Sequence, residues 1–457
     1  MDSQNSSHLK DGECPTYSDG HYPKTSPATR ETVTLFPGWA VRRYHNNSCR
    51  FDLHVNVSGF ATAQRSSQNA TRAQRAFIRL ARGFAALNKL AADHQHQRAS
   101  STSGRSHPQV RHTDTKEEYS IEALDESFRN AHTDLVSGTS ALLSVHESCQ
   151  SELSDTLHRW QSNLESRVQL FWPTALSSRT VILDLFVSPH SKNVAHHVGN
   201  GCDQTHPVGS VKIVTQADGT FQHQFQISWE DLSRHPSAHC ISQIQEHDLI
   251  LNARLLPPPF SPPTSAFTPS YLDISSTESI PAKLQVTITH APIRVISDID
   301  DTVKLSNILH GARAIFRNVF VHDLEHTRIP GMGEWYTKMW QSGVRFHYVS
   351  NGPYQLLPVI LHFFRVSQLP PGSIKLKSYA GRSLFSNLLT APADRKRAGI
   401  LDILESFPDS KFILIGDTGE QDLELYAQVA MKRPTQILAI FVRDVDTETD
   451  PIADPTG

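Results

Sequence analysis

The sequence contains no cysteine pair, no long apolar run and no large surplus of either charge. Its five cysteines are scattered singly along 457 residues. An odd number without a CxxC pair argues against a secreted disulfide framework. The N-terminus, MDSQNSSHLKDGECP, lacks the apolar stretch of a signal peptide. No segment approaches the roughly 18–20 apolar residues that cross a bilayer. We therefore expect a cytoplasmic protein, either soluble or bound peripherally at membranes.

The near balance of charge excludes a protein whose whole surface attracts nucleic acid. The chain has 43 basic and 46 acidic side chains and a formal net charge of −3. A charged partner must then meet a local patch, and we expect no nucleic-acid partner. The length is enough for two or three domains with separate cores.

The first two thirds of the chain favour β-structure interrupted by helices. Residues 1–29 are polar and are expected to be disordered. Between 30 and 290, short runs alternate apolar and polar residues, as half-buried strands do. These runs are 51–59, 180–187, 221–229, 248–256 and 284–288. They predict an antiparallel β-sandwich, with a helical insertion at about 64–168.

Within the insertion, residues 71–92 predict an amphipathic helix. Arg72, Arg75 and Arg79 form a basic stripe, with Arg82 on the same face. Such a helix can lie on anionic lipid. The interpretation we favour is that its apolar face packs on the sandwich, leaving the arginines solvated.

Residues 291–457 follow a different pattern. Apolar strands alternate with helical stretches, and the strand runs are 293–298, 344–351, 373–379, 411–417 and 435–442. Continuous apolar runs indicate strands buried on both faces. This alternation predicts a doubly wound parallel sheet with helices on both sides, in which ligands bind at the carboxyl ends of the strands.

Polar side chains stand at the ends of three of these strands. The candidates are Asp298 and Asp300 after the first strand, Ser350 and Asn351 at the end of the second, and Asp417 and Asp422 from the fourth. Lys396 begins the helix before the fourth strand, with Arg395, Arg397, Lys375 and Lys377 as rivals. Because the carboxyl ends of parallel strands converge, we expect these groups to share one crevice.

Acids, a hydroxyl and a lysine in one crevice suit phosphoryl transfer assisted by Mg²⁺. Magnesium takes carboxylate and phosphate oxygens as ligands and offsets the repulsion among the acids. One carboxylate can attack phosphorus, and a second can protonate the leaving oxygen. A lysine and a hydroxyl can hold the remaining phosphoryl oxygens.

The order of these motifs resembles the haloacid-dehalogenase (HAD) superfamily. They are D-x-D-x-T at Asp298, Asp300 and Thr302, then Ser350, then Lys396, then G-D-x-x-x-x-D at Asp417 and Asp422. The lysine precedes Asp417 by 21 residues, within the family's usual range.

The residues within and around these motifs resemble one particular family of this superfamily. VISDIDDTVK, YVSNGPYQLLPVI and FILIGDTGEQDLELY are similar to the catalytic domain of the actin-patch-protein type of Mg²⁺-dependent phosphatidate phosphatase. TLFPGWAVRRY and DLHVNVSGFA are similar to that family's upstream region. The resemblance, over about 30–445, implies hydrolysis of phosphatidate to diacylglycerol and phosphate at a membrane surface. It also implies actin-patch or endocytic partners at cortical patches, recruited by a Pro-rich tail. This sequence stops at Gly457.

The resemblance also implies catalytic roles. Asp298 would be the nucleophile and a metal ligand, and Asp300 the general acid and base, with its backbone carbonyl on the metal. Asp417 would be a metal ligand, and Asp422 would support that ligation or orient Lys396.

The remaining motif residues would hold the phosphoryl group. These are Thr302, Ser350, Asn351 and Lys396. Because side chains alternate along a strand, Asp298 and Asp300 should face the crevice together, with Asp301 pointing elsewhere as a structural residue.

Two other functions remain open on the sequence. The same chemistry could serve a soluble phosphomonoester, with residues 303–343 covering the site and setting specificity. The β-region could instead make the chain an idle lipid- or protein-binding scaffold. A zinc cluster of His196, His197, Cys202 and His206 is a weaker alternative.

Overall fold

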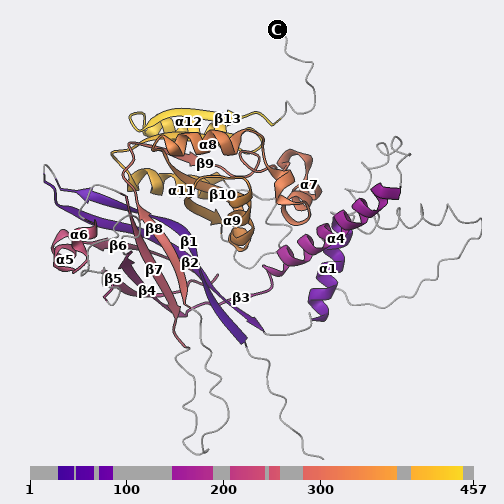
Figure 1. Ribbon diagram of the computed structural model, residues 1–457, viewed down its shortest axis with the longest axis horizontal. Helices are drawn as coiled ribbons and strands as arrows, with labels where there is room; N and C mark the ends of the chain where they lie inside the picture. The colour runs from indigo at the N-terminus through magenta and orange to yellow at the C-terminus, as the bar shows by residue number, and fades with distance from the viewer. Residues whose placement is uncertain are drawn as a thin grey trace, which may run out of the picture.

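The computed structural model arranges the described parts of the chain around two β-sheets (Figure 1). The described residues are 29–45, 48–65, 71–85, 147–188, 206–241, 246–257, 281–377 and 393–445. The predicted disorder of 1–28, most of the insertion (86–146) and the zinc candidates His196, His197 and Cys202 lie outside them. No helix of the described residues is long and apolar enough to cross a membrane.

The first sheet has eight strands. They are β1 (Thr29–Tyr44), β2 (Phe51–Arg65), β3 (Thr174–Ala175), β4 (Thr180–Val187), β5 (Gly209–Val214), β6 (Thr220–Ile227), β7 (His247–Leu255) and β8 (Ala282–Ile288). Their order is β3-β2-β1-β8-β7-β4-β5, with β6 paired to β2. All pairs are antiparallel except β1 with β8. Two short helices, α5 (Trp229–Arg234) and α6 (Ala238–Ile241), follow β6.

Alternation along these strands builds one apolar core. In β4, Val181, Leu183 and Leu185 are fully buried, while their neighbours are partly exposed. Most buried apolar side chains of β1, β2, β4, β6, β7 and β8 belong to a single cluster, whereas Phe36, Trp39 and Phe60 pack in the clusters of the C-terminal region. The predicted strands at 51–59, 180–187, 221–229, 248–256 and 284–288 are therefore confirmed, except that Trp229 begins α5 instead of ending a strand. Strands β1, β3 and β5 were not predicted.

The second sheet is entirely parallel. It consists of β9 (Ile293–Ser297), β10 (Arg345–Pro353), β11 (Gly372–Lys377), β12 (Lys411–Asp417) and β13 (Ile437–Arg443). Their spatial order is β11-β10-β9-β12-β13. The first strand in sequence is thus central, and the order reverses on either side of it. A crevice for ligands forms at such a reversal.

Helices cover both faces of this sheet. Val295 of β9 belongs to a core shared with α8 (Met332–Gln341) and α9 (Leu357–Val366). Ile296, the next residue, belongs to a core shared with α11 (Ala393–Ser406) and α12 (Asp422–Lys432). Burial on both faces explains why the sequence of β9 is apolar without alternation. The prediction of a mixed α/β fold with a parallel sheet is confirmed.

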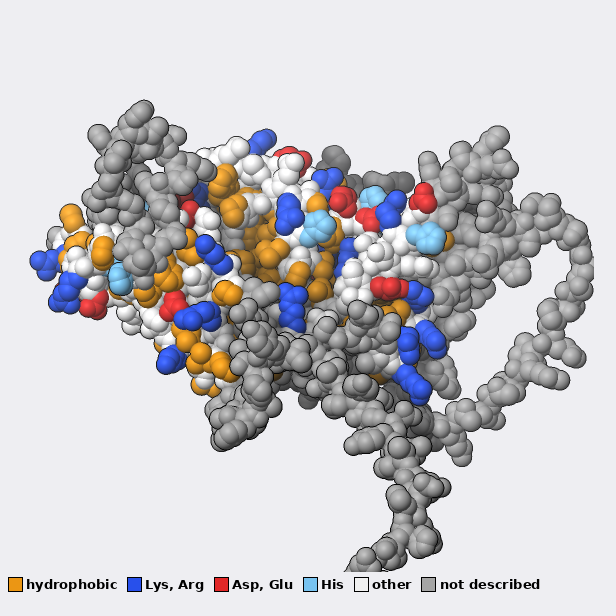
Figure 2. Space-filling view, turned by 60° about the horizontal axis from the view of Figure 1, so that its bottom comes forward, with side chains coloured by type: hydrophobic (Ala, Val, Ile, Leu, Met, Phe, Trp, Pro, Cys, Tyr) orange, Lys and Arg blue, Asp and Glu red, His pale blue; other side chains and the backbone are white. Residues whose placement is uncertain are grey.

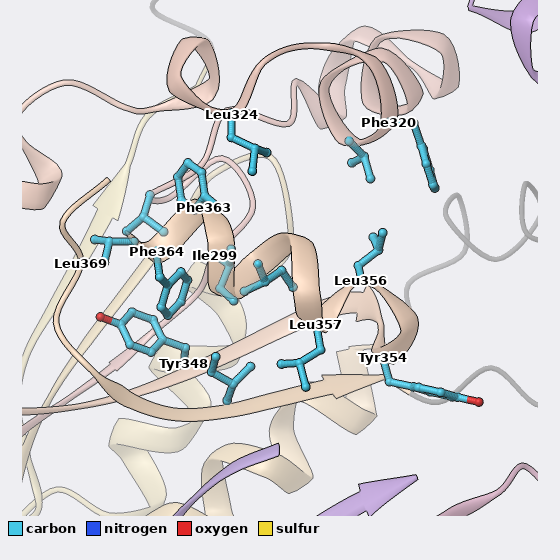
Figure 3. Close-up of a cluster of buried hydrophobic side chains, with 14 of the residues drawn as sticks. Ile299, Phe320, Leu324, Tyr348, Tyr354, Leu356, Leu357, Phe363, Phe364 and Leu369 are labelled. Carbon is cyan, nitrogen blue, oxygen red and sulfur yellow. The ribbon is translucent and has the colours of Figure 1, made fainter. Parts of the chain in front are cut away.

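The connection from β9 to β10 wraps over the strand ends. It contains η2 (Ile308–His310), α7 (Ala312–Phe316), η3 (Arg317–Val321) and η4 (Leu324–Thr327) before α8. Phe320 and Leu324 of this connection, Ile299, and buried side chains of α9 and of its preceding turn η5 (Tyr354–Leu356) belong to the hydrophobic cluster drawn in Figure 3. Ile299 is fully buried in this cluster, which anchors the backbone between Asp298 and Asp300.

The helical insertion packs on the C-terminal region. Helices α1 (Arg72–Phe84) and α4 (Glu147–Gln169) lie beside α7 (Figure 1). The ring of Phe84 meets that of Phe316 at 5.1 Å. Arg167 of α4 donates to the carbonyl oxygens of Val319 and His322. Our expectation that α1 packs on the β-sandwich is therefore wrong, because its apolar partners are α4 and the α7–η3 segment.

The described surface carries both signs of charge. On the face in Figure 2, acidic and basic side chains surround a central area of hydrophobic side chains. Arg72, Arg75 and Arg79 of the predicted basic stripe are exposed, whereas Arg82 pairs with Glu165 of α4. The apolar face of α1 thus packs within the protein, although not on the surface that we expected.

Candidate active site

Asp298 follows β9 at the carboxyl edge of the parallel sheet. Its backbone N–H donates to the carbonyl oxygen of Ile415 at 2.8 Å, which extends the ladder with β12. The residue is 1% exposed. Ser297, just before it, shares a hydrogen bond of 2.8 Å with the Tyr336 hydroxyl of α8. The strand end is therefore fixed by the neighbouring strand β12 and by the helix α8.

Lys396 brings the helix α11 to the same point. Its Nζ lies 2.8 Å from Asp298 Oδ1 and 3.0 Å from Glu420 Oε2, and it also contacts Asp422 Oδ1. A lysine has three donors, and each of these meets a carboxylate. Of its sequence rivals, Lys375 pairs with Asp402 and Arg397 donates to Gln428, away from this cluster. Lys396 is thus the sequence candidate whose ammonium contacts Asp298, Glu420 and Asp422.

Asp417 ends β12 beside Asp298. Its Oδ1 accepts from the backbone N–H groups of Gly419 and Glu420 at 2.7 and 3.0 Å. The Thr302 hydroxyl lies 3.3 Å from Asp298 Oδ2 and 3.4 Å from Asp417 Oδ2. Thr302 is completely buried, so its hydroxyl can orient these two carboxylates from within the protein interior.

Three buried carboxylates converge closely enough to hold a metal ion. Ligand atoms of Asp298, Asp417 and Asp422 all lie within 4.8 Å of one another. Asp422 Oδ2 is buried and has no hydrogen-bond partner in the described structure. With Glu420, this part of the site contains four acids and one lysine. Buried charge of one sign needs a counter-ion. Oxygen ligands suit a hard divalent cation, so these residues fit such a group.

The electrostatics of the acids agree with this assignment. Burial raises the pKa of Asp298 well above its usual range, and Asp422, Glu420 and Asp417 add to the shift while Lys396 opposes it. Burial, with Asp422 and Glu420, raises the pKa of Asp417 to about 7. Burial disfavours charge on Lys396, yet the surrounding acids raise its pKa well above the ordinary value. The acids thus resist ionisation unless a cation stabilises them.

Gly416 allows Asp422 to reach this position. A Cβ on Gly416 would lie 2.3 Å from Asp422 Oδ2 and 2.8 Å from Tyr426 Cε2. No side chain fits there. The glycine of G-D-x-x-x-x-D therefore serves the close approach of α12 to the end of β12.

Asp300 lies apart from the three converging carboxylates. Its Oδ1 accepts from Ser306 Oγ at 2.5 Å and its Oδ2 from Ser350 Oγ at 2.9 Å. The residue is half-buried and lines the cavity described below. The predicted contact of its backbone carbonyl with a metal stays a prediction.

Asp301 turns away from the crevice. Its side chain accepts from the backbone N–H groups of Ser306, Asn307 and Ile308 at 2.7–2.8 Å. Its φ is +51°, an uncommon conformation for a residue other than glycine. The prediction that Asp301 points elsewhere is confirmed, and its contacts organise the loop after β9.

Three residues of the site were missed in the sequence. Glu420 contacts Lys396 and accepts from the side-chain amide of Asn351 at 2.9 Å, which joins the ends of β12 and β10. Lys304 and Ser306 form a hydrogen-bonded pair beside Asp300. Glu420 could have been suspected as an acid inside G-D-x-x-x-x-D. Nothing in the sequence pattern marks the other two.

A cavity of about 610 Å³ opens above these groups. Its lining includes the polar residues Asp300, Lys304, Asn351, Lys396 and Asp422. It also includes the apolar residues Ile308, Ile315, Val319, Leu356, Val359 and Ile360. The 303–343 segment thus forms part of the cavity wall, as we expected.

Comparison with known proteins agrees with this geometry. Residues 293–444 match the family model described as "Phosphatidate phosphatase APP1, catalytic domain". Phosphatidate phosphatase APP1 of Saccharomyces cerevisiae is 45% identical over 152 residues, which are 33% of this chain and 26% of that protein. An uncharacterized protein of Schizosaccharomyces pombe is 40% identical over 154 residues, 34% of this chain and 25% of its own length.

The chain therefore spans about a quarter of the length of these curated relatives. The resemblance to the catalytic domain is confirmed for residues 293–444, a range that contains every candidate site residue. For the upstream region it stays a prediction. Among solved structures, a class C acid phosphatase from Bacillus anthracis with tungstate bound matches 34% of this chain and 68% of its own. Its identity is 13% and its TM-score is 0.22, too low to support any conclusion about fold.

Proposed function

We propose that this chain is a phosphatidate phosphatase that uses a divalent cation, Mg²⁺. The observation that carries the proposal is the buried set of Asp298, Asp417, Asp422 and Lys396 at the reversal point of the parallel sheet. This set lies inside the range that matches the phosphatidate phosphatase catalytic domain. Mg²⁺ would be held by the three aspartates and would neutralise charge on them and on the substrate.

The reaction has two halves. In the first, Asp298 attacks phosphorus, the bond from phosphorus to the leaving oxygen breaks, and Asp300 gives that oxygen a proton. In the second, a water oxygen attacks the aspartyl-phosphate, the bond to Asp298 breaks, and Asp300 takes the proton from water. The contact of 2.8 Å with Lys396 orients the attacking carboxylate.

The cavity supports a substrate that is polar at one end and apolar at the other. Asp300, beside which the leaving oxygen would lie, lines the same cavity as the apolar residues Ile308, Ile315 and Leu356. A glycerolipid presents its ester and hydrocarbon groups directly behind the phosphate. The phosphate and the hydrocarbon groups of phosphatidate suit this mixed lining, and peripheral membrane binding follows from that substrate. A cytoplasmic location is part of the same proposal.

We also propose the finer fold assignments. Residues 291–457 form a HAD-like doubly wound domain, supported by strand order and by helices on both faces. Residues 30–290 form a β-sandwich domain, supported by the common core of β1, β2, β4, β6, β7 and β8. Actin-patch or endocytic partners remain a proposal that rests on the family resemblance.

The test is phosphate release from phosphatidate in mixed micelles, with and without Mg²⁺. We expect activity that requires the cation and that falls below about a thousandth of its original value in Asp298→Asn. Asp184→Asn makes the same chemical change on β4, outside the site, and should keep full activity. Release without the cation, or an active Asp298→Asn, would contradict the proposal. Preference for soluble phosphomonoesters in a parallel panel would refute the lipid substrate alone.

A further inference from the structure

A buried lysine beside the site belongs to none of the phosphatase motifs. Lys304 is 4% exposed and stands in the loop after β9. Its ammonium donates to Ser306 Oγ at 3.1 Å and, within the described parts of the chain, has no ion pair. Burial lowers the pKa of Lys304, and Asp300 opposes this shift. A buried ammonium without an ion pair costs stability, so its position next to Asp300 needs a functional reason.

The directions of the hydrogen bonds around Asp300 are determined. An ammonium and a backbone N–H can only donate. Ser306 accepts from Lys304, and Ser350 accepts from the N–H of Gly352 at 2.8 Å. Each serine hydroxyl therefore has its own proton free for Asp300, and each lies within 2.9 Å of one carboxylate oxygen. Both oxygens of Asp300 are held as acceptors.

The loop that carries Ser306 is itself fixed. Asp301 binds the backbone N–H of Ser306 and of the next two residues. The N–H of Leu305 donates to the carbonyl oxygen of Thr327 at 2.7 Å. Ser306 is 1% exposed. The hydroxyl that meets Asp300 therefore has little freedom to turn away.

We propose that Lys304 and Ser306 are positioning residues that aim Asp300 at the attacking water in the second half of the reaction. This inference rests on the proposed function, since it needs the aspartyl-phosphate on Asp298. The water oxygen bonds to phosphorus, the bond from phosphorus to Asp298 breaks, and Asp300 receives the water proton. A carboxylate held at both oxygens waits in the orientation that this transfer requires.

The two halves can be separated with 4-nitrophenyl phosphate. Its leaving group departs as a stable anion, so the first half needs no proton from Asp300, whereas the second half still needs a base. In Ser306→Ala and in Lys304→Met, we expect the first turnover to release 4-nitrophenol at the wild-type rate. Steady-state turnover should fall by about 10- to 100-fold, which leaves a visible burst. Ser306→Thr and Lys304→Arg, which keep the hydroxyl and the charge, should restore most of the steady-state rate.

Thr327→Val provides a matched control. Thr327 is 1% exposed, lies on the same connection and donates its hydroxyl to the Leu324 carbonyl oxygen at 2.9 Å. Its loss should change neither phase. If the burst and the steady-state rate of the Lys304 and Ser306 variants fall together, or if neither falls, the positioning role is wrong. A wild-type chain that hydrolyses 4-nitrophenyl phosphate but not phosphatidate would refute the lipid substrate only. Hydrolysis of neither compound would refute both proposals.

Discussion

The two sheets of this protein place their charged residues differently. In the eight-stranded sheet, the fully buried positions of β4 are Val181, Leu183 and Leu185, and the ion pair between Arg254 and Asp184 lies on the opposite, more exposed face. In the parallel sheet, the buried ends of β9 and β12 carry acids that surround Lys396. Both sheets have apolar interiors, but among the described residues a cluster of buried acids lies only at the strand ends of the parallel sheet.

This difference separates what stabilises the fold from what the site requires. Apolar burial stabilises a sheet wherever it occurs. Buried charges cost desolvation free energy that their mutual attraction returns only in part. Charges at the strand ends of the parallel sheet are therefore explained by chemistry, and core substitutions in the two sheets should differ in whether they lower the rate per folded molecule.

The largest effect should come from Lys396→Met. Removing the cation leaves the buried acids Asp298, Glu420 and Asp422 without a counter-charge, and breaking such a pair costs about 3–5 kcal/mol in the free energy of unfolding. Activity should be lost as well, because Asp298 loses its contact of 2.8 Å. Urea unfolding in EDTA, together with phosphate release, measures both.

Leu183→Ala is the comparison variant from the other sheet. This substitution should lower the free energy of unfolding by about 2–5 kcal/mol and leave the rate of phosphate release per folded molecule unchanged. If Lys396→Met unfolds like the wild type, or if Leu183→Ala lowers that rate, the division between the two sheets fails.

The second effect should appear as a pH dependence of the metal-free protein. The pKa of Asp417 is raised from 3.8 to about 7. A raised folded-state pKa gives stability that is fully present below pH 3.8 and is lost as pH rises through about 7. A pKa shift of this size corresponds to a change of at most about 4 kcal/mol in the free energy of unfolding between low and high pH. Unfolding in EDTA should therefore be easier at pH 8 than at pH 5.

Added Mg²⁺ should reverse this loss, because it binds the ionised carboxylates. Its stabilising effect should be larger at pH 8 than at pH 5. In Asp417→Asn, the pH dependence of the metal-free protein should flatten. Equal stabilisation by Mg²⁺ at both pH values would mean that the three carboxylates do not form the metal site.

Much of the parallel sheet and its site could be predicted from the sequence. Continuous apolar runs marked strands covered on both faces, and the acids after them stood at the edge where parallel strands converge. Asp298, Lys396, Asp417 and Asp422 come together for this reason. Side-chain alternation also placed Asp301 correctly, although the strand ends before it.

What escaped prediction depends on contacts between distant parts of the chain. Glu420 gains its place from Lys396 and Asn351, which lie 24 and 69 residues away. Lys304 is hydrophilic and would be expected at the surface, yet the loop fixed by Asp301 buries it. Our prediction of the surface on which α1 packs was wrong. Amphipathic spacing shows that a helix has an apolar face, but it does not show which surface that face contacts.

The smallest effect should come from Arg254→Ala on the eight-stranded sheet. Arg254 Nη2 lies 3.3 Å from Asp184 Oδ2, but the Arg254 side chain is 55% exposed. Exposed ion pairs contribute roughly 0–1 kcal/mol because water and salt screen them. Asp184 also keeps the hydrogen bond from Ser210 Oγ at 2.6 Å, so it is not left alone. Urea unfolding at low and at high salt should show a loss below about 1 kcal/mol that shrinks as salt is added. A loss of unfolding free energy comparable to that of Lys396→Met would show that burial does not set the strength of these ion pairs. The contrast between the two sheets would then depend on the number of acids around each cation.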